Sequence, residues 1–452
     1  MQGGRSINDG VLATGIAAPL ALLGAADHPQ RLELNDEVHA RPPEALSTPA
    51  RITFLALYTR WAEREAQHRH LAELVRQHGR EPPPPEANHY SADLGPLRVK
   101  WERHTEFTRY MVIVPGCDAG APFARPALSF LPADWVAALP GEVLVATHVA
   151  LLHAGSEHLQ IGEIAARLFA GNTLIGSHVG GGNGTALTDL RVHPDRFGRL
   201  LLLDRRLTRR QAGRMIQRLL EIDAYRILAL LALPVARELA PTLAAQEQEL
   251  AAITAVLAAA VESDEPLLLE RLTRLEAAIS KRAAENHYRF SAANAYYELV
   301  QQRIAELREE RIEGLQTFGE FMQRRLAPAI HTCRTLAARQ EALSTRAARV
   351  TQLLSTRVDI TRERQNQAVL ESMNRRAKLQ LRLQETVEGL SVAAVTYYVV
   401  GLVGYAAKSL KAAALPVDPD ITTGIAIPLV AVLVALGVRR TRRWIARREG
   451  DH

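Results

Sequence analysis

Three stretches of the sequence carry residue types whose spacing could support chemistry. The first lies near the N-terminus and places carboxylates, an imidazole and a guanidinium in one short run, at Asn35, Asp36, Glu37, His39 and Arg41. Oxygen and nitrogen donors of this kind could assemble a site or bind a divalent cation, but their spacing matches no known ligand signature. The alternative interpretation is a capped turn with ion pairs before the first strand.

The second stretch is a glycine-rich loop followed by polar residues. It comprises Gly180, Gly181, Gly182 and Gly184, and then Asp189, Arg191 and His193. The backbone N–H groups of such a loop can hold a phosphate. However, no Gly-Lys-Ser/Thr ending follows, and the sequence GGGNG is not the dinucleotide fingerprint. We therefore favour a hairpin between strands, with the polar residues after it on the surface.

The third stretch is a polar stripe close to the C-terminus. Steps of three, four and seven residues place its members on one face of a helix, at Asn366, Met373, Ala377, Gln380, Gln384, Glu388 and Ser391. Turned toward a symmetry axis, this face would suit a hydrated pore, and Thr396 farther along is a further candidate pore-facing residue. The alternative is a stripe that faces solvent on a peripheral helix.

The stripe leads into two apolar runs, 390–407 and 421–438, which contain no charged residue. About 18 helical residues suffice to cross a bilayer core of about 30 Å. Six arginines follow the second run, at Arg439, Arg440, Arg442, Arg443, Arg447 and Arg448. We therefore predict a transmembrane hairpin with the lipid bilayer as its partner; the alternative is a buried helix pair in a soluble core.

Charge placement predicts the orientation of this hairpin. Basic residues flank both runs on their outer sides, whereas the loop between them balances Lys408 and Lys411 with Asp418 and Asp420. The positive-inside rule then places both termini of this multi-pass protein in the cytoplasm. Two cysteines, Cys117 and Cys333, suit a reducing compartment. The apolar stretch 11–26 could alternatively be a signal peptide.

The remaining chain separates into regions of different pattern. We expect an irregular segment over 1–50, an α/β domain over 51–207, a helical stalk or coiled coil over 208–388, the hairpin over 389–438 and a basic cytoplasmic tail over 439–452. In the second region, strand-like runs alternate with helical ones, and we predict strands over 51–58, 97–100, 109–114, 142–151 and 200–204. The predicted fold class is thus an α+β membrane protein.

Proline placement predicts one very long helix. No proline occurs between Pro328 and Pro416, and helix-compatible sequence runs from near Ala342 through the first apolar run. Such a helix needs helical partners for its apolar positions, from this chain or from identical ones. The net charge of +6 is concentrated near the apolar runs, and we find no nucleic-acid motif. We also find no Ser-His-Asp or Cys-His arrangement that would indicate an enzyme.

Several strings resemble a bacterial family of uncharacterised membrane-anchored proteins, the domain of unknown function numbered 3422. They are LNDEVHARPP, TDLRVHPDRFGR, QAGRMIQRLLEIDAYRILALLALPVAR and SMNRRAKLQLRLQETVEGLSVAAVTYYVVGLVGY. The layout also resembles the CorA-type magnesium transporters, which implies a homo-oligomer, by analogy a pentamer. Their Gly-Met-Asn signature is absent, because the first apolar run ends in GLVGYAAK.

Three functional hypotheses follow. The first is an inner-membrane homo-oligomer with a CorA-like layout, acting as an ion channel, a transporter relative or a membrane-tethered sensor. The second is a membrane-anchored scaffold whose helical region binds protein partners. The third is an enzyme domain that holds a phosphorylated ligand at the glycine-rich loop. No cofactor is identified from the sequence, and a divalent cation is the only one we consider.

Overall fold

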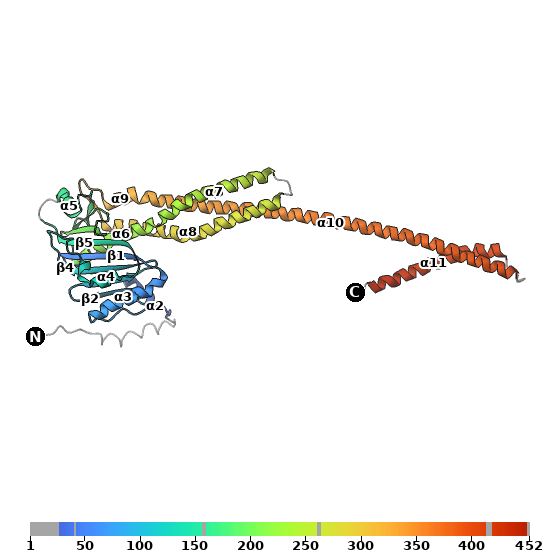
Figure 1. The fold of residues 1–452 in the computed structure, drawn as a ribbon, viewed down its shortest axis with the longest axis horizontal. Helices are drawn as coiled ribbons and strands as arrows, with labels where there is room; N and C mark the ends of the chain where they lie inside the picture. Colours follow the sequence, from blue (N-terminus) through green and yellow to red (C-terminus); the bar gives the residue numbers. More distant parts are fainter. Residues whose placement is uncertain (1–26, 40–41, 156–159, 260–263, 413–417, 450–452) are drawn as a thin grey trace. The chain divides into compact units, whose positions relative to one another are not determined.

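The computed structural model describes residues 27–39, 42–155, 160–259, 264–412 and 418–449, and it has the α+β class (Figure 1). The chain divides into two compact units. The first comprises Met1–Ala255 and Leu272–Ala348, and the second comprises Val256–Arg271 and Arg349–His452. Each unit is described below by itself.

The first unit is built on a nine-stranded sheet with the order β2-β3-β4-β1-β5-β8-β7-β6-β9. Neighbouring strands are antiparallel except β5 and β8, which are parallel. The strands are β1 (Ala50–Tyr58), β2 (His89–Asp93), β3 (Arg98–Arg103), β4 (Phe107–Pro115), β5 (Glu142–His153), β6 (Ile175–Val179), β7 (Gly184–Thr188), β8 (Gly198–Asp204) and β9 (Glu310–Arg311).

Helices cover both faces of this sheet, which explains why its central strands are largely apolar. In β1, Phe54 and Ala56 pack toward α6 (Arg209–Leu230), α8 (Glu265–Leu307) and α9 (Phe318–Arg325). Leu55 and Leu57 pack on the opposite face toward α3 (Arg64–Gln77) and α4 (Ala133–Ala137). The alternation of side chains along a strand therefore separates two cores.

A capping signal in the sequence marks the start of α6. Thr208 caps α6 and forms a capping box with Gln211. The other helices are α2 (Arg31–His39), α5 (Ile161–Leu168), α7 (Ala232–Ala259), α10 (Ala327–Ala412) and α11 (Pro419–Glu449), with 3-10 turns η1 (Trp61–Glu63) and η2 (Ala127–Phe130). Helix α2 lies in the segment 1–50, where we expected irregular structure, and the apolar stretch 11–26 lies outside the described residues.

The structure contains the long uninterrupted helix that proline placement predicts. Helix α10 extends over Ala327–Ala412 and therefore includes the whole first apolar run. Pro328 lies in its first turn, where the missing N–H costs no intrahelical bond. The absence of any other proline before Pro416 lets the helix continue.

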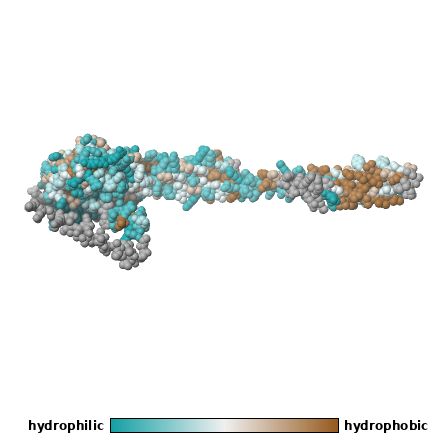
Figure 2. All heavy atoms as spheres, turned by 90° about the horizontal axis from the view of Figure 1, so that it is seen from below, coloured by the Kyte–Doolittle hydropathy of each residue, from teal (hydrophilic) through white to brown (hydrophobic). Residues whose placement is uncertain are grey.

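In the second unit, the C-terminal part of α10 and α11 form two helices whose apolar side chains are exposed. Leu402 is 67% exposed and Leu433 is 59% exposed, and Figure 2 shows apolar atoms gathered over this helix pair. The helices approach at Gly404, where a Cβ atom would lie 3.4 Å from Thr423 Oγ1. Both are long and apolar enough to cross a membrane by length and composition.

Candidate functional site

Charged side chains lie buried between the sheet and the helices α6 and α8 in the first unit. The carboxylates of Glu102 and Glu221 are 1% and 4% exposed, and the guanidinium of Arg109 between them is 10% exposed. Burial of a charge is unfavourable unless it is paired and hydrogen-bonded. This concentration of buried charge is therefore our candidate functional site.

The local structure brings each of these groups to the same interface. Glu102 on β3 and Arg109 on β4 are direct cross-strand partners in the antiparallel ladder, so their side chains share one face. Gln217 and Glu221 are one helical turn apart on α6, and Arg303 and Glu306 are neighbours on α8. Sheet and helices thus present complementary charges across the core.

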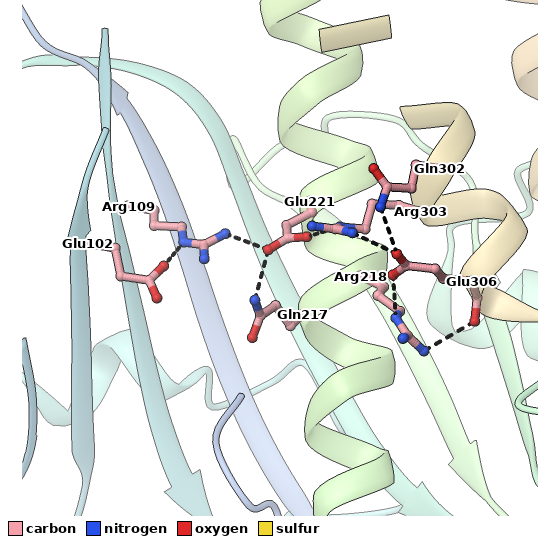
Figure 3. Close-up of polar contacts among 8 residues, drawn as sticks. All are labelled: Glu102, Arg109, Gln217, Arg218, Glu221, Gln302, Arg303 and Glu306. Carbon is pink, nitrogen blue, oxygen red and sulfur yellow. Dashed lines mark hydrogen bonds and ion pairs between the residues drawn. The ribbon is translucent and has the colours of Figure 1, made fainter. Parts of the chain in front are cut away.

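The groups form a chain of alternating charge from Lys100 on the sheet to Arg218 on α6. Figure 3 shows this chain from Glu102 onward. Lys100 Nζ lies 3.0 Å from Glu102 Oε1, and Glu102 pairs with Arg109. Arg109 Nη1 donates to Glu221 Oε1 at 3.0 Å, and Gln217 Nε2 donates to the same oxygen at 2.9 Å.

The chain of charges continues onto α8. Glu221 also accepts from Arg303, and Arg303 Nη1 donates to Glu306 Oε1 at 2.9 Å. Arg218 Nε donates to Glu306 Oε2 at 2.9 Å, and its Nη1 donates to the Glu306 carbonyl oxygen at 3.1 Å. Each carboxylate in the chain therefore has at least two cationic partners.

This pairing fixes the protonation state of the buried acids. Burial alone would raise the pKa of Glu102, but Arg109 and Lys100 outweigh burial and lower its pKa to about 2. The pKa of Glu221 is likewise lowered, because Arg109 and Arg303 outweigh the effect of burial. Burial raises the pKa of the nearby Tyr225 hydroxyl to about 12. These carboxylates remain ionised at neutral pH, so they are poor general acids.

The segment 42–49 passes over the end of the charge chain. Lys100 Nζ donates to the Pro42 carbonyl oxygen at 2.7 Å, and Ser91 Oγ donates to Glu44 Oε1 at 2.6 Å. Leu46 N donates to the Arg209 carbonyl oxygen at 3.0 Å. We refer to residues 42–49 as the strap, because they tie β2 and β3 to the start of α6.

Two further polar contacts join the sheet to the same helices. Arg289 on α8 donates to both carboxylate oxygens of Glu106, at 3.2 and 2.6 Å. Thr147 Oγ1 on β5 donates to Asp223 Oδ2 at 2.7 Å, and Arg226 donates to the other oxygen of Asp223. The interface between the sheet and the helices is therefore held by paired charges as well as by apolar packing.

The glycine-rich loop forms the turn of the β6–β7 hairpin, as our favoured interpretation predicts. Gly180, Gly181 and Gly182 have φ values of 65°, 65° and 77°, a conformation that side chains with a Cβ rarely adopt. Gly180 N donates to the Leu307 carbonyl oxygen at 2.7 Å. The glycines are thus explained by the turn, and this N–H group already has an acceptor.

The polar residues after the loop are not all at the surface, which corrects our expectation. Asp189 and His193 are each 5% exposed, and His193 Nε2 lies 2.9 Å from Asp189 Oδ2. Asn172 Nδ2 donates to the same oxygen at 2.8 Å, and Asp189 Oδ1 accepts from Arg191 N. These hydrogen bonds allow Asp189 and His193 to be buried, whereas the Arg191 side chain is exposed.

The other candidate residues lie apart from the charge chain. Asn35, Asp36 and Glu37 are exposed on α2, whereas the His39 side chain and Arg41 lie outside the described residues. The polar stripe lies on α10 in the second unit, with Gln380 and Gln384 exposed. Among the described residues, no three His, Cys, Asp or Glu side chains are grouped so that they could hold a metal ion.

The charge chain was not predicted from the sequence. Its partners are far apart in sequence: Arg109 and Glu221 are separated by 112 residues. The signal that could have revealed it is a charged residue inside an apolar element. Arg109 interrupts the apolar strand FTRYMVIV, and Glu221 follows Leu219 and Leu220 and precedes Ile222 on α6.

Comparison with known protein families agrees with the family that several strings of the sequence resemble. The sequence model of a family described as a protein of unknown function (DUF3422) matches residues 26–445. The chain belongs to this family. The family description carries no activity. No curated protein and no solved structure matches the chain.

Proposed function

We propose that this chain is a membrane-tethered protein, inserted through the end of α10 and through α11, whose sheet-based unit acts as a sensor or scaffold in the cytoplasm. The observation that carries the proposal is the contrast between the two units. Large apolar side chains are mostly buried in the sheet-based unit but mostly exposed along 390–412 and 418–436, including Tyr398 at 71% and Ile425 at 64%. An apolar surface of this extent needs a partner, and acyl chains match its length and composition.

Cysteine labelling tests both the insertion and its orientation. In full-length protein lacking Cys117 and Cys333, Ser409→Cys places a thiol near the end of α10, where Ser409 is exposed. We expect a membrane-impermeant maleimide to label this thiol in intact bacterial cells, because the positive-inside rule puts the connecting loop outside.

Ser372→Cys is the matched control, since Ser372 is also exposed on α10 but lies before the apolar run. This thiol should react only after the cells are lysed. Labelling of both thiols in intact cells would overturn the orientation. Release of the protein from membranes by alkaline carbonate would overturn the insertion itself.

The polar stripe distinguishes a tethered sensor from an ion channel. Steps of four, three and four residues from Ser391 bring Val395, Tyr398 and Leu402 to the same helix face. The face is therefore polar only up to the start of the apolar run and apolar beyond it. This pattern favours a tether over a hydrated pore, and it is why we place the channel second.

The second candidate is the homo-oligomer with a CorA-like layout, in which the stripe of each copy faces the others and lines an ion pathway. Its support is the exposed stripe on α10 itself. Gln380→Cys in the cysteine-free protein should then form a disulfide between copies in native membranes. Arg382→Cys is the control, because it lies two residues along the helix but about 200° around it.

Equal crosslinking at both positions, or none, would overturn an arrangement with the stripe at an axis. Preferential crosslinking of Gln380→Cys would support it, and ion flux into vesicles would then separate a channel from an assembled sensor. Replacing Gln384 and Glu388 by alanine should change the flux of a channel and leave the assembly of a sensor intact.

A further inference from the structure

A small cavity lies beside the charge chain, between α6 and α8. Its volume is about 160 Å³, and it is lined by Pro43, Arg214, Gln217, Arg218, Glu221, Arg303 and Glu306. A water molecule occupies about 30 Å³ in the liquid, so the cavity has room for a ligand of several heavy atoms. The strap contributes Pro43 to its wall.

The charges around this cavity do not balance. Three guanidinium groups, those of Arg214, Arg218 and Arg303, line it together with only two carboxylates, Glu221 and Glu306. Both carboxylates are already paired with arginines of the charge chain, Glu221 with Arg303 and Glu306 with Arg218. Glu221 is in addition bound by Arg109. The cavity therefore carries an excess of positive charge.

Arg214 is the source of that excess. Its side chain is half-buried on α6, one turn before Arg218, and it has no hydrogen-bond or ion-pair partner in the described parts of the chain. Arginines on adjacent turns of a helix repel one another. An unpaired arginine beside two others is thus a position that an anion would stabilise.

We propose that this cavity binds a small phosphate-type oxyanion, contacted by Arg214 and by the donors of Arg218 and Arg303 that the charge chain does not use. The planar guanidinium group matches two oxygens of a phosphate at once, which makes arginine the preferred side chain for such ligands. The Glu221 and Glu306 carboxylates hold Arg303 and Arg218 in place, so these arginines are ordered before the anion arrives. The site is independent of the proposed membrane tether.

Binding of inorganic phosphate and of pyrophosphate to the full-length protein in mild detergent tests the proposal. Titration calorimetry at constant ionic strength should show one anion bound per chain. Arg214→Gln should weaken binding by about tenfold or more, the loss expected for a charged hydrogen-bond donor. Arg214→Lys, which keeps the charge but not the paired donors, should bind the anion more tightly than Arg214→Gln and more weakly than the unaltered protein.

Arg210→Gln is the matched control, because it removes the same charge from an exposed position one turn earlier on α6, outside the cavity lining. It should bind the anion as the unaltered protein does. Absence of binding, equal binding by Arg214→Gln and the unaltered protein, or equal loss in both glutamine variants would overturn the site. Circular dichroism verifies that each variant is folded before titration.

Discussion

Arg109 neutralises two buried carboxylates at once, Glu102 on the neighbouring strand and Glu221 on α6. Arg109→Met keeps most of the side-chain volume but removes the charge. We expect it to lower the free energy of unfolding by about 3–5 kcal/mol, because it leaves buried carboxylates undercompensated. Denaturant unfolding of the full-length protein in detergent measures this change.

The exposed pair of Arg375 and Glu371 provides the control, since its side chains are 78% and 71% exposed. Arg375→Met should change the free energy of unfolding by less than about 1 kcal/mol. Adding Glu102→Gln to Arg109→Met should restore part of the lost stability. If Arg109→Met and Arg375→Met changed the free energy of unfolding by similar amounts, burial would not strengthen the charge chain.

His148 should make the protein sensitive to acid. It is buried on β5, with its ring stacked on Phe197 at 4.0 Å between ring centres. Burial lowers its pKa from an ordinary value of 6.5 to about 4. Between these values the unfolded chain binds a proton that the folded chain does not, so stability falls as the pH falls through this range.

The measurement is the thermal unfolding midpoint between about pH 6.5 and about 4. His148→Gln should have a shallower dependence on pH over this range, although its absolute stability is lower because the ring stacking is lost. Glu102 contributes in a more acidic window, since its folded-state pKa is about 2. Parallel curves for His148→Gln and the unaltered protein would contradict the assignment.

For single residues, the sequence indicates which types are unusual in their position but not which side chains they bind. A charge within an apolar strand, as at Arg109, predicts burial with a counter-charge, yet Glu102 and Glu221 come from different elements. Asp189 and His193 show the same difficulty, because polar residues next to a turn usually lie at the surface. Only the tertiary fold shows that these side chains bind each other.

Among the elements, the contact between the strap and α6 depends on one glycine. A Cβ atom built on Gly213 would lie 1.6 Å from the Glu44 carbonyl oxygen. We therefore expect Gly213→Ala to displace the strap and to lower the free energy of unfolding by about 1–3 kcal/mol. This loss would occur although alanine is more favourable than glycine inside a helix by about 1 kcal/mol.

Gly162→Ala is the control for this substitution, because Gly162 lies in α5 with no atom within 4 Å of the added Cβ. It should leave the stability unchanged or raise it. Proteolysis of the N-terminal segment should become faster in Gly213→Ala alone. A stabilising effect of Gly213→Ala would mean that the strap does not pack on α6 as closely as described.

The elements most visible in the sequence are those buried on both faces. The apolar runs of β1, β4, β5 and β8 predict strands correctly, because packing between two helical layers demands continuous apolar sequence. Strand β2 is an edge strand with the polar sequence HYSAD, and it has no such signal. Strands β6 and β7 are short and each contains a glycine, so the hairpin was predicted from its glycine-rich turn but the bounds of its strands were not.

For the whole molecule, the proposed orientation depends on the arginines in the last part of α11, after the second apolar run. Replacing four of them by asparagine should reduce labelling of Ser409→Cys from outside, because basic residues retain a flanking segment in the cytoplasm. The positions are Arg439, Arg440, Arg442 and Arg443. The same cysteine labelling in intact cells measures the effect.

An equal change of charge elsewhere is the control. Four exposed arginines of the sheet-based unit, Arg205, Arg206, Arg209 and Arg210, can be replaced in the same way. This variant should label like the unaltered protein. Unchanged labelling in the first variant would show that the arginines after the second apolar run do not determine orientation.

The core that joins the sheet to α6, α8 and α9 also determines when the protein can finish folding during synthesis. Leu46 and Ile330 belong to one apolar cluster, so most of the chain must leave the ribosome before this core closes. Strand β1 is made early, but it lies between β4 and β5 and under helices that are made much later. Such distant contacts slow folding and leave apolar strands open to aggregation. Nascent chains that stall before α9 should therefore depend on chaperones.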